Sequence, residues 1–328
     1  MAVSKDIQKL GKLGSGAPKE TVKQYEEKLL VATNHGHVPD IVHLLELGVN
    51  PNCCGGDDKV MPLHVVAARG DMVIFDVLYK TNKLDLNVVS SRGTPALIIG
   101  ITSMHDVFVK TMAEKGANVN ITDRFLRTPL HHSVFTLQIK MIKILLDHNC
   151  NRNPVDVFYG TPLSIAAIDV ACFKMVKTLV EGGVAVNFYR GTQLLPLILE
   201  LTLHCTDQNR LDICEYLMKN GIEMNSIDPR TGRNALHFVA ISNNVAMAKL
   251  LLKYGTMATA KDLKFLYPYE VALQHKNDQV ACILEAAHTE RHNSFGLAQK
   301  DQTALTTLVQ YFEEQDKKED IYKKGGFK

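Results

Sequence analysis

Polar and apolar positions repeat at helical spacing in two short runs between residues 127 and 153. Thr128 and Pro129 begin the first run, because a threonine side chain can cap a helix and a proline at its first position loses only an unpaired N–H. Asn149 ends the second run, since asparagine tolerates the left-handed conformation that terminates many helices. The apolar faces of the two runs consist of Leu130, Val134 and Phe135, and of Ile139, Ile142, Leu145 and Leu146. Helices this short need neighbours to bury such faces.

The same pattern returns along the chain with a period of 33 or 34 residues, apart from one longer step of 39 residues between Pro196 and Ala235. It is marked by Met61-Pro-Leu-His64, Thr94-Pro-Ala-Leu97, Thr128-Pro-Leu-His131 and Thr161-Pro-Leu-Ser164, and it continues at Pro196, in Asn234-Ala-Leu-His237 and at Pro268. A period near 33 with a Thr-Pro-Leu-His start is typical of a helix–turn–helix solenoid. The chain here resembles the ankyrin-repeat family over roughly residues 28–287. The resemblance implies an all-α, ankyrin-type solenoid of about eight repeats, including atypical caps, with short β-hairpin finger loops between them.

The period also divides the chain into segments. We expect a disordered leader at 1–21, the repeat solenoid at 22–287 and a linker at 288–302. Residues 303–315 place Leu305, Leu308, Val309 and Phe312 on one helical face and so predict an amphipathic helix, followed by a charged tail at 316–328. That helix either folds back on the repeats or offers its apolar face to a partner.

Composition narrows the location and the class of ligand. The net charge of +2 gives no reason to expect a nucleic-acid partner. The seven cysteines are scattered without a Cys-x-x-Cys pair, which predicts free thiols, no metal site and a reducing compartment. No apolar run approaches the roughly 20 residues of a membrane helix. We expect a monomer in the cytoplasm, or in the nucleus, that carries no cofactor.

The histidines do not suggest catalysis. His64, His131 and His237 occupy the Thr-Pro-Leu-His slot, where the family resemblance implies backbone hydrogen bonds between repeats. His131 and His132 are adjacent, and adjacent helical side chains point about 100° apart, so they cannot share one substrate atom. We therefore predict no catalytic residue.

The loops that join the repeats depart from the small polar residues usual in this family. Aromatic and arginine residues gather in three consecutive tips of a chain that has no tryptophan. Exposed aromatics beside arginine are typical of binding hot spots. The predicted partner-binding residues are Arg124, Phe125, Leu126, Arg127, Phe158, Tyr159, Phe188, Tyr189 and Arg190. The alternative is that the rings tuck under neighbouring loops as a small satellite core. A further tip, Asp262–Leu266, is also apolar.

Asparagines that end the repeats suggest a second hypothesis. Four of them follow a leucine by eight residues, and in this family such spacing resembles substrates of asparagine hydroxylation. The four candidates are Asn52, Asn153, Asn187 and Asn225.

Together these features predict a non-enzymatic protein-interaction module, an adaptor or scaffold, that binds a partner protein through its finger loops and concave helices. The partner should be extended or offer an acidic and apolar surface. One alternative is a regulatory subunit or ubiquitin-ligase substrate adaptor that uses the C-terminal helix. Another is a nucleotide or nucleic-acid sensor, in which the aromatic tips stack on bases and the arginines bind phosphates.

Overall fold

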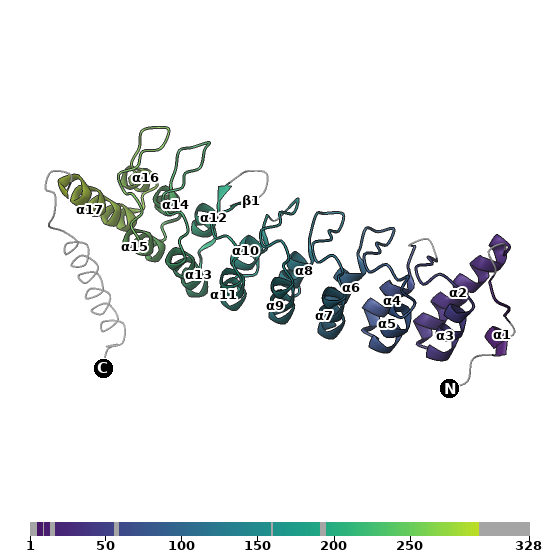
Figure 1. The fold of residues 1–328 in the computed structure, drawn as a ribbon. Helices are drawn as coiled ribbons and strands as arrows, with labels where there is room; N and C mark the ends of the chain where they lie inside the picture. The colour runs from purple at the N-terminus through teal and green to yellow at the C-terminus, as the bar shows by residue number, and fades with distance from the viewer. Residues whose placement is uncertain are drawn as a thin grey trace, which may run out of the picture. The chain divides into compact units, whose positions relative to one another are not determined.

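The repeats predicted from the period are present as eight helix–turn–helix pairs. The computed structural model describes residues 5–8, 10–13, 17–55, 59–158, 160–190 and 195–294 (Figure 1). The eight pairs are α2 (Lys19–His35) with α3 (Val38–Glu46), α4 (Pro62–Arg69) with α5 (Met72–Tyr79), α6 (Ala96–Thr102) with α7 (Asp106–Glu114), α8 (Pro129–Phe135) with α9 (Ile139–Asp147), α10 (Pro162–Ser164) and the π-helix η1 (Ile165–Asp169) with α11 (Phe173–Glu181), α12 (Leu197–His204) with α13 (Gln208–Lys219), α14 (Ala235–Ser242) with α15 (Val245–Lys253), and α16 (Pro268–Gln274) with α17 (Asp278–Ser294). The predicted all-α class and the number of repeats are confirmed.

From the second pair onward, the first helix of each pair begins where the sequence pattern places it. α4, α8, α10 and α16 start at the marked prolines, and α6 and α12 start one residue later. In every pair except α12 with α13, the turn to the second helix then passes through one left-handed residue. Gly70 fills this position with φ 67°, whereas Met104 and Leu137 fill it with φ 64° and 59°. Since bulky side chains disfavour this conformation, the turn geometry is imposed by the fold at the latter two.

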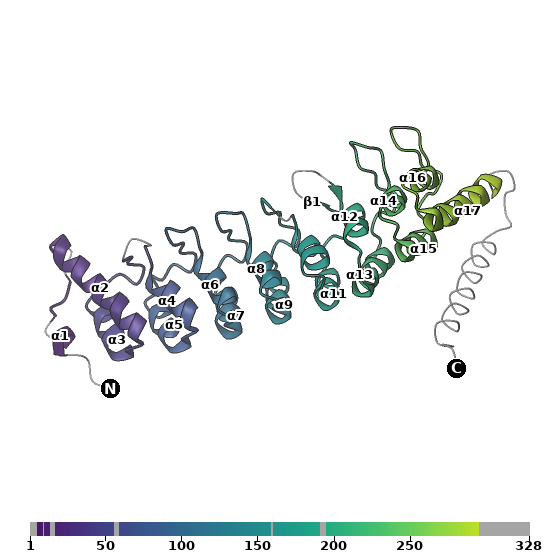
Figure 2. The ribbon, with the colours of Figure 1, turned by 180° about the vertical axis from the view of Figure 1, so that it is seen from behind.

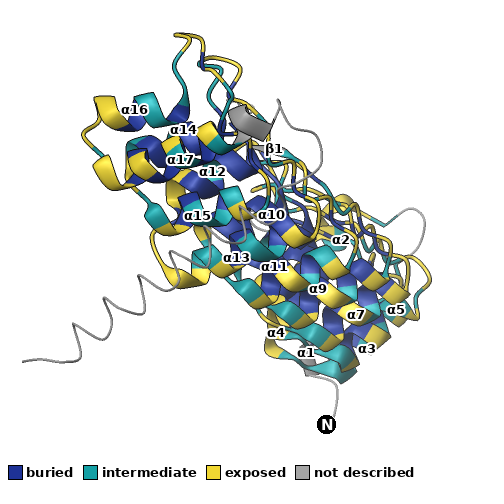
Figure 3. Cartoon of the chain, turned by 90° about the vertical axis from the view of Figure 1, so that its left-hand side faces the viewer, coloured by how far each residue is buried: buried dark blue, intermediate teal, exposed yellow. Residues whose placement is uncertain are grey.

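The chain divides into two compact units near residue 185. The first holds the described residues before that point, and the second holds those after it together with 171–173. In the first unit α6 contacts both α4 and α8, and among the second helices α3 contacts α5 and α7 contacts α9. Their buried faces appear in dark blue in Figure 3. The loops that precede α6 and α8 rise on the same side in Figure 1 and, from behind, in Figure 2.

The second unit repeats this arrangement. α14 contacts α12 and α16, while α15 contacts α13 and α17. Its first loop forms a small antiparallel hairpin of β1 (Tyr189–Arg190) and β2 (Leu195–Pro196), with Tyr189 opposite Pro196. This hairpin and two isolated bridges, Gly55–Val60 and Val89–Pro95, are the β structure of the described residues. They correspond to the short finger hairpins that the sequence predicts.

Two segment boundaries differ from those expected. The short helix α1 (Lys5–Gln8) contacts α3, and the backbone N–H of Leu13 donates to Leu47 O at 2.9 Å, so part of the expected leader lies against the first repeat. At the other end α17 continues through Ser294, into the range expected to be a linker. The helix predicted at 303–315 and the tail at 316–328 lie outside the described residues.

Candidate functional site

The loop before α8 is shaped by one aspartate. Asp123 Oδ1 accepts the backbone N–H groups of Phe125 at 2.8 Å and of Arg127 at 3.0 Å. Its own N–H donates to Arg127 O at 3.0 Å, which closes the loop. Asp156 does the same in the next loop, where its Oδ1 accepts from Phe158 at 3.1 Å and from Gly160 at 2.8 Å. Each loop is therefore a finger whose shape is fixed by hydrogen bonds from its backbone N–H groups to a carboxylate at its base.

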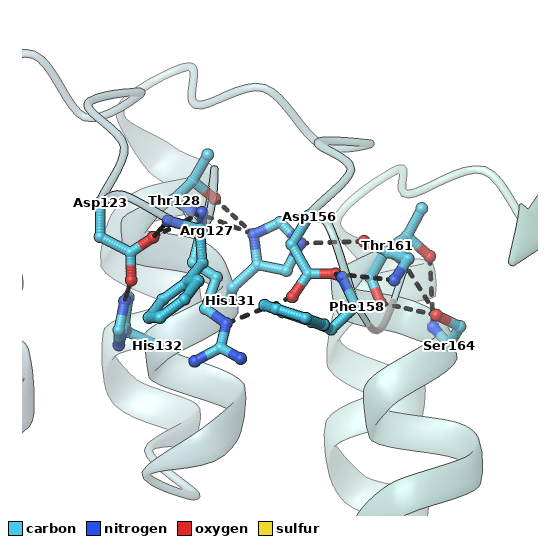
Figure 4. A network of polar contacts seen from close by, with 11 residues as sticks. Asp123, Arg127, Thr128, His131, His132, Asp156, Phe158, Thr161 and Ser164 are labelled. Carbon is cyan, nitrogen blue, oxygen red and sulfur yellow. Dashed lines mark hydrogen bonds and ion pairs between the residues drawn. The ribbon is translucent and has the colours of Figure 1, made fainter. Parts of the chain in front are cut away.

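The two fingers are tied to each other. Val157 N–H donates to Phe125 O at 3.3 Å, and Arg127 Nε lies 3.3 Å from Asp156 Oδ2 (Figure 4). The Asp156 carboxylate is buried, so this ion pair is poorly screened by solvent. We refer to residues 123–127 and 156–160 as the first finger pair; residue 159 lies outside the described part of the chain.

His131 secures the base of the pair. Its Nδ1 accepts the Thr128 backbone N–H at 3.1 Å, which leaves the ring proton on Nε2 to donate to Gly160 O at 3.1 Å (Figure 4). Burial lowers the pKa of His131, despite the neighbouring Asp156 carboxylate. The ring is thus held neutral with both nitrogens engaged, which is a structural role and leaves no lone pair for catalysis.

His132 points elsewhere, as its adjacent helical position predicts. Its Nε2 lies 3.1 Å from Asp123 Oδ2, so it ties α8 to the base of its own finger. Burial lowers the pKa of His132 even though the Asp123 carboxylate opposes that shift. The two histidines therefore serve different fingers.

Aromatic rings and arginines gather at the first finger pair. The rings of Phe125 and Phe158 lie 5.5 Å apart between centroids. The Arg124 guanidinium lies 4.7 Å from the Phe125 centroid. Arg127 lies 5.1 Å from Phe125, 5.1 Å from Phe135 and 5.9 Å from Phe158. Phe125 and Arg127 are half-buried in this cluster, whereas Leu126 and Phe158 are exposed and form what we call its open face.

The open face is apolar. Leu126 is 54% exposed and Phe158 is 55% exposed, with Val155 and Val157 also exposed beside Phe158. Leu126 has φ 59°, a conformation that costs a bulky residue about 1–2 kcal/mol. Leu137 combines the same conformation with a similar exposure in a turn between helices, so what distinguishes this tip is the number of exposed apolar side chains that its two fingers carry.

The remaining predicted residues do not join this cluster in the described structure. Phe188 belongs to the second unit, where it is half-buried and its O accepts the Leu197 N–H at 3.1 Å. Tyr189 and Arg190 form β1, of which the structure describes the backbone only. Tyr159 lies outside the described residues. The structure therefore brings together Arg124, Phe125, Arg127 and Phe158 with Leu126 at the tip.

The contacts of Arg127 are internal to the chain. Its guanidinium lies against Asp156 and three rings, which favours a structural role for this residue; its predicted part in binding stays a prediction. Arg124 is exposed and contributes a positive charge to the surface of this cluster.

A second finger pair in the second unit has the same construction. It consists of residues 228–233 and 262–266. Leu263 N–H donates to Thr231 O at 2.9 Å, and Arg233 Nε lies 3.2 Å from Asp262 Oδ2. His237 Nδ1 accepts the Asn234 N–H at 3.2 Å, and Nε2 lies 3.1 Å from Leu266 O. Backbone tie, ion pair and buried histidine thus recur at equivalent places.

Comparison with known proteins agrees with this architecture. A profile of ankyrin repeats in three copies matches residues 29–123 and 108–189, and a second profile of many ankyrin repeats matches 201–252. The chain belongs to the ankyrin-repeat family. Ankyrin repeats are general protein–protein interaction modules, so the family indicates a protein partner without specifying which.

Individual relatives are more distant. The chain is 24% identical to the chicken nuclear factor NF-kappa-B p105 subunit over 62% of its own length and 21% of that protein. It is 33% identical to the fowlpox virus ankyrin repeat protein FPV244 over 76% of its length and 38% of that protein. It therefore spans a minor part of either relative. The crystal structure of the ankyrin repeat domain of Bcl-3 is similar in fold, with a TM-score of 0.63 and 18% identity over 70% of this chain and all of that one.

The ankyrin repeat asparagines proposed for hydroxylation form a ladder. Each side-chain oxygen accepts a backbone N–H from the following repeat: Asn52 from Asp85 at 2.8 Å, Asn153 from Ala185 at 2.8 Å, Asn187 from Glu223 at 2.6 Å and Asn225 from Met257 at 2.8 Å. Asn87 and Asn120, which were not candidates, make the same bond to Asn118 and Asn151. This shared structural role explains why asparagine stands at these positions. Hydroxylation of the four candidates stays a prediction.

The described residues were also compared with the requirements of a metal site, a membrane-spanning helix and a reactive thiol. Within them no cluster of three or more His, Cys, Asp or Glu side chains is placed to hold a metal ion, and no helix is long and apolar enough to cross a membrane. Burial and the nearby Glu26 raise the pKa of the Cys53 thiol to about 12, and burial raises that of Cys150 to about 11. Such thiols stay protonated at neutral pH and are poor nucleophiles.

The finger pairs carry a sequence signal that the loop composition alone did not reveal. Arg-x-Pro-Leu-His at 127–131 and Arg-x-Ala-Leu-His at 233–237 each have an aspartate 29 residues after the arginine, namely Asp156 and Asp262. An arginine followed one repeat later by an aspartate at the base of the next finger indicates a tie between fingers. This correlation distinguishes a structural arginine from an exposed one such as Arg124.

Proposed function

We propose that this chain is a non-enzymatic interaction module that binds a partner protein through the open face of the first finger pair. The observation that carries the proposal is the group of exposed apolar side chains on these two fingers, Leu126, Val155, Val157 and Phe158. The fingers beneath are rigid, so binding would order few groups and lose little conformational entropy. Leu126 and Phe158 supply the apolar contact, while Arg124 favours an acidic neighbour and speeds association.

The partner we propose is an extended segment, or an edge of a domain, that presents carboxylates and apolar side chains. Burying Leu126 and Phe158 would contribute about 1.5–3 kcal/mol each. A nucleotide-sensing role finds less support, because Phe125 already has the Arg124 and Arg127 guanidinium groups against its ring. Roles as a regulatory subunit or a ubiquitin-ligase adaptor depend on residues 303–315, outside the described structure, and stay predictions, as does a cytoplasmic or nuclear location.

The experiment compares the double variant Leu126→Ser/Phe158→Ser with a matched control. Leu137 is 61% exposed and has φ 59°, so Leu137→Ser makes the same chemical change at the same backbone conformation in a different surface of the same unit. Wild type and both variants are used for affinity purification from cells of the source organism, with quantitative mass spectrometry and thermal melts.

We expect at least one specific protein to be lost about tenfold or more with the double variant and kept with the control, because each exposed apolar contact is worth about a factor of ten. Melting temperatures should agree within about 2 °C, since both positions are exposed. An unchanged set of captured proteins would refute the proposal. So would an equal loss with Leu137→Ser.

A further inference from the structure

The second finger pair ends in two exposed apolar side chains, Leu263 and Phe265, which we call the apolar knob. Leu263 is 65% exposed and Phe265 is 78% exposed, the highest value among the exposed large hydrophobic residues of the described chain. Phe265 also has φ 62°, the left-handed conformation that an aromatic residue seldom adopts. The position equals that of Leu126 in the first finger pair, three residues after the aspartate at the base of the finger.

The knob is held rigidly away from the helices. Asp262 Oδ1 accepts the N–H of Lys264 at 2.8 Å and of Leu266 at 3.1 Å, and Asp262 O accepts the N–H of Phe265 at 2.9 Å. The Leu263 N–H is fixed to Thr231 O of the neighbouring finger. A Cβ at Gly232 would lie 3.0 Å from Leu263 N, so glycine there permits the close approach of the two fingers. These bonds leave the two apolar side chains projecting from a preformed loop.

Three exposed cationic residues belong to the same two fingers or directly precede them. Arg230, Lys261 and Lys264 are exposed; Arg230 Nε lies 3.5 Å from Asp228 Oδ1, although its side chain is still 64% exposed, and Lys261 Nζ lies 4.7 Å from the Tyr267 ring centroid. The carboxylates of the two loops, Asp228 and Asp262, are buried and accept hydrogen bonds from their own loops. Burial opposes the ionisation of Asp262, but the N–H groups of Leu266 and Lys264 and the Arg233 side chain outweigh it and lower its pKa. The tips therefore present apolar and cationic groups, with their carboxylates turned inward.

We propose that the second finger pair is an independent docking site for an acidic segment of a partner protein, whose apolar side chains cover Leu263 and Phe265 while its carboxylates face Arg230, Lys261 and Lys264. This site goes beyond the function proposed above, because it uses no residue of the first finger pair and belongs to the other unit. A chain with two such sites can hold two partners, or two segments of one partner, and gains affinity through the effective concentration of the second contact.

A protein segment fits this surface better than a bilayer does. Two apolar side chains and three cations would give only marginal attachment to an anionic membrane, where stable anchoring needs a stronger second signal. A peptide can instead cover both apolar side chains and place its charges opposite the three cations. Preformed loops of this kind bind without an ordering step.

The test selects random 12-residue peptides displayed on phage against the full chain, with depletion on Leu263→Ser/Phe265→Ser. Selected peptides should be acidic and contain two or more apolar residues. The affinity of one such peptide, labelled with fluorescein, is then measured by anisotropy. We expect the double variant to bind it at least about tenfold more weakly and Lys264→Glu to weaken it at low salt. Leu273→Ser, at an exposed leucine of α16, is the matched control and should leave the affinity unchanged.

A second variant separates binding from folding. Phe265→Gly removes the ring and relieves the left-handed strain, so this variant should melt no earlier than wild type and still lose the peptide. The Leu126→Ser/Phe158→Ser variant should bind the peptide as wild type does, which separates this site from the first finger pair.

Three results would overturn the inference. One is that selection yields no peptide depleted by the double variant, or yields basic peptides. Another is that Phe265→Gly retains full affinity. The third is that vesicles of phosphatidylcholine and phosphatidylserine at 70:30 co-sediment the wild-type chain but not the double variant, which would identify a lipid surface as the occupant.

Discussion

The two finger pairs share one scaffold and differ at their tips. In both, a backbone bond joins neighbouring fingers, an arginine reaches the aspartate of the next finger, and a buried histidine spans the two repeats. In the first pair the arginine lies among three phenylalanine rings, and Leu126 and Phe158 are half exposed. In the second, Leu263 and Phe265 stand well clear of the loop. The comparison shows that the same contacts fix both pairs of fingers while the exposed residues between these contacts differ, so we expect any difference in binding to arise from those exposed residues.

The largest expected effects test the shared scaffold. Leu130 and Leu236 are fully buried at equivalent places in the two pairs. Leu130→Ala and Leu236→Ala should each lower the free energy of unfolding by about 2–5 kcal/mol, since each leaves a cavity in a tightly packed core. Urea unfolding followed by circular dichroism measures both. A small effect at only one of the two leucines would mean that the scaffolds are not equivalent.

The next effect should distinguish the two pairs. Arg127→Ala and Arg233→Ala each leave a buried aspartate without its ion-pair partner, at a cost of about 1–3 kcal/mol after allowing for partial exposure of the arginine. Arg127→Ala should cost about 1 kcal/mol more, because the guanidinium also loses its ring contacts. The same unfolding assay checks this difference. Adding Asp156→Asn should restore part of the loss, and a double variant with no recovery would contradict the assignment of the tie.

Both pairs should respond to pH in the same direction. Burial lowers the pKa of His131 and of His237 below the ordinary value of 6.5. The unfolded chain then binds more protons than the folded chain below about pH 6.5, so the contribution of these residues is complete above that pH and is lost as the pH falls toward the lowered folded pKa. Melting temperatures should therefore decrease from pH 7 to pH 5. His131→Gln, though less stable at pH 7, should show a shallower decrease. A stability that rises on acidification would refute the neutral, fully bonded histidines.

The smallest effect concerns the left-handed tips. Leu126→Gly and Phe265→Gly relieve about 1–2 kcal/mol of backbone strain, against about 0.4–1 kcal/mol from the greater freedom of glycine in the unfolded chain. Each should raise the free energy of unfolding by roughly 0.5 kcal/mol while weakening binding at its own finger pair. Differential scanning calorimetry alongside peptide binding measures both quantities. If either variant is markedly destabilised, that side chain contributes to the core and not to a binding surface.

Sequence reasoning predicted the fold well because the determinants of the repeat are local. The Thr-Pro-Leu-His start, the apolar spacing of α8 and α9 and the terminal asparagines each act within one repeat or its neighbour. It also predicted that Phe125 and Phe158 lie together, since neighbouring fingers are one period apart. The role of Arg127 could not be read from composition, because an arginine beside aromatics looks the same whether its carboxylate partner is internal or external. The strain at Leu126 and Phe265 likewise depends on backbone angles that these loop sequences do not specify.

The asparagine ladder has a consequence for how such a chain changes over evolutionary time. Each rung joins a side chain to a backbone N–H about one period further on, as Asn52 does with Asp85 and Asn120 with Asn151. Six consecutive repeats thus offer the same acceptor at their ends, and each donor lies just after the second helix of the following repeat. Duplication or loss of one complete period preserves every rung, whereas an insertion of a few residues between two rungs breaks the register of a neighbour. Gene segments that encode whole periods are therefore the units by which this array can lengthen, shorten or acquire a new finger pair without losing its fold.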